Sequence, residues 1–84
     1  MPLENRVYLL QEDERAVLWV DLPNHGLQAG DMGTVVNLYA DGRAYAIEFF
    51  TADGQTWDVV MVEATTVRPV QSDEMLHVRA LVPA

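Results

Sequence analysis

The segment GLQAGDMGTVV, residues 26 to 36, places three glycines around Asp31 immediately before a β-branched run. Glycines at this kind of spacing can hold a phosphate when a helix N-terminus or a lysine completes the site. This segment contains no lysine, and a strand rather than a helix is predicted to follow it. The pattern therefore favours a structural turn, in which Gly30 and Gly33 bend the chain and Asp31 accepts hydrogen bonds from nearby backbone N–H groups.

The two histidines, His25 and His77, are the candidate general bases of the chain. A catalytic base needs a nucleophile within hydrogen-bond reach, and the chain has no cysteine and a single serine, Ser72. His25 lies in sequence between Asp21 and Asp31, but this spacing follows no zinc or calcium motif. We therefore predict no catalytic residue, no metal and no cofactor.

The charge of the chain bears on its partners. Thirteen acidic residues face five arginines and no lysine, for a formal net charge of −8 at pH 7. Such a chain repels phosphate backbones and attracts cations, so we expect a basic protein partner or self-association rather than nucleic acid. The alternative is that the acids serve only solubility. Because cysteine and long apolar segments are absent, we expect a cytoplasmic protein without membrane contact.

Turn residues at short intervals separate β-branched and aromatic runs, a pattern typical of an all-β meander. We expect a loop over Pro23–Asp31, tight turns at Gly42 and Gly54, and a short helical turn over 63–66. This arrangement predicts a small SH3-like, partly open barrel of about five antiparallel strands, with an OB-type barrel as the alternative. The predicted strands cover residues 15–22, 33–39, 44–50, 55–62 and 67–70.

The length of 84 residues predicts a single domain, with an N-terminal extension (1–14), a barrel core (15–70) and a C-terminal tail (71–84). Two short segments lie at its ends. Residues 3–11 fit a strand better than a helix, and residues 73–82 fit either a short helix or an added strand.

Strand alternation divides the aromatic residues between two faces. It predicts Tyr45, Phe49 and Trp57 in the core, and it places Val35 and Tyr39 on a common face. Glu48 is expected to point outward and to pair with Arg68. We predict a partner-binding face in which two exposed aromatic side chains are rimmed by four carboxylates: Tyr39, Phe50, Asp21, Asp31, Glu48 and Asp58.

Residues 15 to 80 also resemble the bacterial family called domain of unknown function 4926. The resemblance implies an SH3-like barrel with no established activity. It also implies a small stand-alone protein encoded beside another small bacterial protein, an arrangement reminiscent of toxin and antitoxin pairs. The loop GLQAGD departs from the lysine-rich form usual in that family. The matching positions are Gly26-Leu27, Gly30-Asp31, Gly33, Val35-Val36, Tyr45, Glu48-Phe49, Gly54 and Arg68-Pro69.

The GDMGTVV segment is also similar to the KOW motif of ribosomal and transcription-factor barrels, and to the barrel of nitrile hydratase β-subunits. From charge, aromatic content and resemblance together, we expect a non-enzymatic, acidic protein-interaction module of the antitoxin or immunity type. The alternatives are a KOW-like barrel associated with nucleic acid and an accessory subunit of a metalloenzyme.

Overall fold

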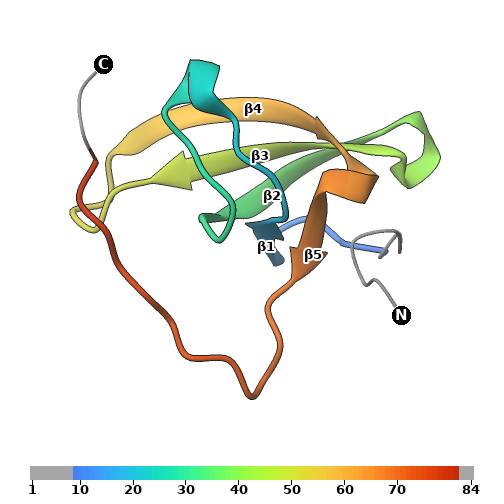
Figure 1. The fold of residues 1–84 in the computed structure, drawn as a ribbon. Helices are drawn as coiled ribbons and strands as arrows, with labels where there is room; N and C mark the ends of the chain where they lie inside the picture. The colour runs from blue at the N-terminus through green and yellow to red at the C-terminus, as the bar shows by residue number, and fades with distance from the viewer. Residues whose placement is uncertain (1–8, 82–84) are drawn as a thin grey trace.

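Five antiparallel strands form one curved sheet in the computed structural model, which describes residues 9–81 (Figure 1). The sheet has the order β4-β3-β2-β1-β5, so the first four strands form a meander and the last returns beside the first. Within the described residues no ladder joins β4 to β5, and the sheet stays open. The prediction of an all-β, partly open SH3-like arrangement is confirmed. The strands are β1 (Arg15–Leu18), β2 (Met32–Tyr39), β3 (Ala44–Phe50), β4 (Thr56–Glu63) and β5 (Val67–Pro69).

Short 3₁₀ turns η2 (Pro23–His25), η3 (Ala40–Gly42) and η4 (Ala64–Thr66) lie between the strands. At η3 the N–H of Arg43 donates to Ala40 O at 3.2 Å, and both central residues, Asp41 and Gly42, have positive φ. Ala40 also has a positive φ, and Tyr39 pairs with Ala44, so a four-residue loop, residues 40–43, joins β2 to β3 through a left-handed turn that Gly42 accommodates. Gly54 has a φ of +87° in the turn between β3 and β4, where its N–H donates to Thr51 O at 2.9 Å. The turns at Gly42 and Gly54 and a short helical turn near residues 63–66 are thus present, as predicted.

The two ends of the predicted fold differ from the structure. β1 ends at Leu18 rather than at residue 22. The N–H of Trp19 still donates to Thr66 O at 2.8 Å, in register with the β1–β5 pairing, but Thr66 already belongs to η4. Residues 71–81 form neither a helix nor a strand, so that expectation is wrong. The strand expected over 3–11 lies outside the described residues at 3–8, and residues 9–11 belong to no strand.

A bulge in β2 reverses the predicted alternation of its side chains. The β2–β3 register shifts between Val35 and Asn37. An extra residue in one strand turns the following side chains to the other face. Val35 is therefore buried and Leu38 packs against the core, while Tyr39 is exposed on the opposite face. The prediction that Val35 and Tyr39 share a face is wrong.

A core position for Trp57 implies, by alternation, that Val59 and Met61 also face the core, but the buried side chains of β4 are Val60 and Val62. Trp57 is 39% exposed and is not part of the core. The β3–β4 register shifts between Phe49 and Phe50, opposite the position of Trp57 in β4. The prediction of a buried Trp57 is wrong.

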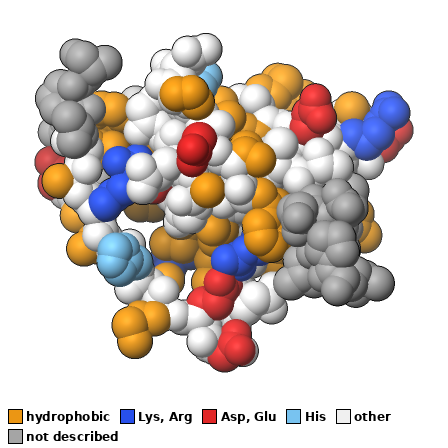
Figure 2. Space-filling model, viewed as in Figure 1, with side chains coloured by type: hydrophobic (Ala, Val, Ile, Leu, Met, Phe, Trp, Pro, Cys, Tyr) orange, Lys and Arg blue, Asp and Glu red, His pale blue; other side chains and the backbone are white. Residues whose placement is uncertain are grey.

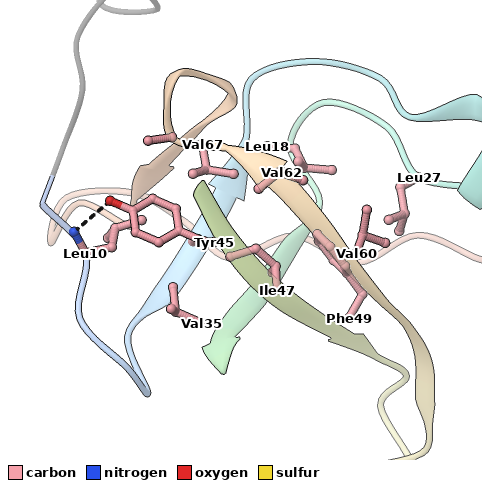
Figure 3. Close-up of a cluster of buried hydrophobic side chains, with 12 residues drawn as sticks. Leu10, Leu18, Leu27, Val35, Tyr45, Ile47, Phe49, Val60, Val62 and Val67 are labelled. Carbon is pink, nitrogen blue, oxygen red and sulfur yellow. Dashed lines mark hydrogen bonds between the residues drawn. The ribbon is translucent and has the colours of Figure 1, made fainter. Parts of the chain in front are cut away.

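The core lies on the concave side of the sheet around Tyr45, which is fully buried, as predicted (Figure 3). Its hydroxyl accepts a hydrogen bond from the N–H of Leu10 at 3.3 Å, which ties the segment before β1 to β3. Phe49 is also buried, as predicted. The cluster comprises Leu10, Ala16, Leu18, Leu27, Val35, Tyr45, Ile47, Phe49, Val60, Val62, Ala64 and Val67.

The two glycines of the opening motif have different structural roles. Gly30 has a φ of +95° and open space around it, so it is a turn residue. Gly33 is buried in β2, where an added Cβ would lie 2.5 Å from Ile47 Cγ2 and 2.7 Å from Glu48 O. Gly33 thus permits a close approach of β2 to β3, and the prediction that it bends the chain as a turn residue is wrong.

Candidate interaction surfaces

The two predicted contact aromatics are both exposed, but they do not form one patch. Phe50 ends β3, whereas Tyr39 lies opposite Ala44 at the other end of the same strand. Six residues of extended strand separate these positions by roughly 20 Å. A single small contact area therefore does not include both rings.

Among the four predicted carboxylates, only Glu48 lies beside a predicted aromatic, since it shares the outer face of β3 with Phe50. Asp58 contacts His25, with 2.7 Å between Oδ2 and Nδ1, and Asp21 accepts a hydrogen bond from Ala29 N–H at 2.8 Å. Asp31 forms an ion pair with Arg79. These three side chains hold loops in place, so the continuous acidic rim does not assemble.

The expected ion pair between Glu48 and Arg68 is absent from the described residues. In the strand order, β3 and β5 are separated by two strands, a distance of about 14 Å. Glu48 instead accepts a hydrogen bond from the hydroxyl of Thr56 on β4 at 2.5 Å. Arg68 forms a bidentate pair with Glu74, at 2.7 and 2.5 Å, and its guanidinium lies 5.1 Å from the centroid of the Trp19 ring.

A surface that the sequence did not single out lies on β4. Val59 and Met61 are 52% and 61% exposed, and they stand opposite Glu48 and Ala46 of β3 on the outer face of the sheet. We call Val59 and Met61 the β4 patch. β4 ends the strand order, so one of its backbone edges has no ladder partner within residues 9–81. Apolar residues at alternate positions could have indicated this exposed surface from the sequence. Both faces of the strand are apolar, however, so the sequence does not show which face is exposed.

Trp57 and His25 hold η2 against β4. The indole N–H of Trp57 donates to His25 O at 2.9 Å, while the imidazole of His25 contacts Asp58. A Cβ added at Gly26 would lie 3.3 Å from the Trp57 ring, so the loop packs closely on the indole. His25 thus has a structural partner, and the described residues hold no group of three or more metal-ligating side chains.

The C-terminal segment forms a second candidate site. Residues 71–81, which we call the strap, leave β5 and arch away from the sheet before returning to the loop that precedes β2 (Figure 1). Near one end, Arg68 binds Glu74. At the other, Arg79 donates to Asp31 at 2.8 and 2.5 Å and to Gly26 O at 3.1 Å. An open cavity of about 740 Å³ lies between the strap and the sheet.

These ion pairs shift the pKa values of the strap contacts. Partial burial alone would raise the pKa of Asp31, but hydrogen bonds from Arg79 and from Gln28 N–H, together with the charge of Arg79, bring it below its ordinary value. Hydrogen bonds from Arg68 and from Gln71 N–H likewise lower the pKa of Glu74. Both carboxylates are therefore ionised at neutral pH, and their ion pairs with Arg79 and Arg68 attach the strap to the rest of the domain at two points.

Fold and surfaces together define a small, acidic, all-β domain with SH3-like strand order. The chain belongs to the family described as Domain of unknown function (DUF4926), whose model matches residues 12–69. The match ends where β5 ends, so it excludes the strap, whereas the resemblance was expected to reach residue 80. No curated protein and no solved structure matches the chain. The described residues include no helix long and apolar enough to cross a membrane.

Proposed function

We propose that this protein is a non-enzymatic interaction module that binds a basic protein partner by accepting one of its strands along the free edge of β4. The observation that carries the proposal is the exposure of Val59 and Met61 at alternate positions of an edge strand. A strand added to an open edge gains main-chain hydrogen bonds, and its alternate side chains contact the exposed face.

The composition of β4 supports this use of the edge. Natural proteins guard free edges with lysine, proline or short strands, because an unprotected edge pairs with other chains. Thr56–Glu63 is eight residues long and contains neither lysine nor proline. Its last five residues, Val59 to Glu63, carry a charge only at the final position, so most of this stretch has no charged guard.

Charge supports a basic partner over a neutral one. Glu48 and Glu63 flank the β4 patch on the same face, and neither forms an ion pair within the described residues. The chain as a whole carries −8. A partner strand that alternates apolar residues with lysine or arginine would match both features, as in an acidic antitoxin or immunity protein that neutralises a basic target.

The test is a pull-down from native lysate. It compares the basic protein bound by the wild-type chain with that bound by the Met61→Lys and Met75→Lys variants. Lysine at Met61 places the natural guard of an edge strand on the β4 patch. Met75 is 92% exposed on the strap and serves as a control with the same charge change. We expect one basic protein, bound stoichiometrically by the wild type and by Met75→Lys, to lose affinity at least tenfold for Met61→Lys.

Three outcomes would overturn the proposal. Equal capture by Met61→Lys and wild type would exclude the β4 edge. A wild-type dimer that Met61→Lys dissociates would assign the edge to a second copy of the chain instead of a basic partner. Salt-sensitive binding of the wild type to DNA or RNA would favour the KOW-like alternative.

A further inference from the structure

The cavity under the strap differs in charge from the rest of the protein. Three of the four arginines in the described residues line it, together with His77. Its two acidic lining residues, Asp31 and Glu74, are already bound to Arg79 and Arg68. The third arginine, Arg15, forms no ion pair within the described residues, so the cavity presents uncompensated positive charge in a chain of net charge −8.

The position of Arg15 follows from the sheet. On β1, Ala16 and Leu18 point to the core, so Arg15 and Val17 share the outer face. Val17 lies between Met32 of β2 and Arg68 of β5 in the ladders. The cavity floor therefore consists of an apolar row with arginines at its margin. Figure 2 shows a hollow on this face, with Lys or Arg side chains and a His side chain around it.

The walls and the size suit a small molecule. The volume of about 740 Å³ falls in the range of roughly 300–1,000 Å³ that is usual for small-molecule sites. Apolar side chains stand on both sides, and those of the strap are poorly covered, since Met75 and Val78 are 92% and 87% exposed. The apolar lining includes Val17, Met32 and Phe50 from the sheet side, and Met75, Leu76 and Val78 from the strap.

We propose that the strap cavity binds an amphipathic carboxylate, whose apolar chain lies between the sheet and the strap and whose carboxylate pairs with Arg15. Guanidinium groups recognise carboxylates through two parallel hydrogen bonds, and Arg15 is the lining arginine with this capacity unused. The unbranched methionines at positions 32 and 75 adapt to a flexible chain. This site is separate from the β4 patch, so the inference does not rest on the proposed function.

The test is calorimetric titration of the full chain at neutral pH with octanoate, decanoate and octan-1-ol. Each added methylene is expected to tighten binding about three- to fourfold, so decanoate should bind about tenfold more tightly than octanoate. Octan-1-ol, which lacks the charge, should bind about tenfold more weakly. Arg15→Gln should remove the preference for octanoate over octan-1-ol, whereas Arg43→Gln, an exposed arginine outside the cavity, should retain it.

The apolar half of the proposal has its own variant. Leu76→Ser, on the strap, should reduce the gain from octanoate to decanoate, and Met61→Lys on β4 should leave both affinities unchanged. The proposal is overturned if the wild type binds none of the three probes, if Arg15→Gln keeps the preference for the carboxylate, or if Arg43→Gln loses it as well. Urea unfolding of each variant establishes that it is folded before titration.

Discussion

Replacement of Gly33 by alanine tests the close approach of β2 and β3. The added Cβ would lie 2.5 Å from Ile47 Cγ2, 2.7 Å from Glu48 O and 3.1 Å from Phe49 Cδ1. Ile47 is fully buried and Glu48 O belongs to the sheet backbone, so neither can move without disturbing the ladder. Overpacking in a core costs about 1–3 kcal/mol, and two contacts this short place Gly33→Ala at the upper end, about 3 kcal/mol.

A loss of this size is a large part of the stability of an 84-residue chain, roughly 4–12 kcal/mol in total. It should lower the melting temperature by about 12–24 °C. Urea unfolding followed by tryptophan fluorescence measures the free energy, and Gly54→Ala is the matched control. Gly54 has a φ of +87° and no atom near an added Cβ, so its replacement costs only about 1–2 kcal/mol. A Gly33→Ala protein as stable as Gly54→Ala would refute the steric argument.

Two further predictions concern the polar contacts that tie the ends of the chain to the sheet. Tyr45→Phe removes the acceptor of the Leu10 N–H and should lower the free energy of unfolding by about 1–2 kcal/mol, measured by urea titration. The pKa of Asp31 is lowered in the folded state, so its ion pair stabilises the protein fully at pH values above the ordinary aspartate pKa, near 4. This stabilisation is lost as the pH falls through the lowered pKa of the folded state. Arg79→Gln should raise the pKa of Asp31 in a carboxyl NMR titration, and an unchanged pKa would contradict the ion pair.

The fold was predictable because local signals agree with one another. The Asp-Gly turns, the β-branched runs and the alternation of Tyr45, Ile47 and Phe49 all indicate the same antiparallel meander. The prediction of which side chains face the core failed on β4, where the local signals do not agree. The TWDVVMVE segment is apolar at both odd and even positions, so period-two patterning cannot choose between Val59 and Val60.

The bulge in β2 leaves no comparable trace in the sequence, because no glycine or proline marks the shift between Val35 and Asn37. One unrecognised residue there moves Tyr39 to the opposite face from Val35. The exposure of Tyr39 was predicted correctly, but its neighbours on the surface were not.

The candidate sites depend on contacts that sequence patterns do not encode. Asp31 was identified as a turn residue, and its hydrogen bond from Gln28 N–H agrees with that prediction. Its partner Arg79 lies 48 residues further along the chain, and no periodicity connects the two. The strap cavity lies between the sheet and a segment that this pair and the Arg68–Glu74 pair hold at two points.

The family match ends at Pro69, the last residue of β5, and the strap begins two residues later. All five strands fall inside the family match, and the strap falls outside it. A relative with a different C-terminal sequence could thus keep the same scaffold while gaining, losing or retuning whatever binds over β1. Diversification of this kind requires no repacking of the core, since the strap contributes none of its buried side chains.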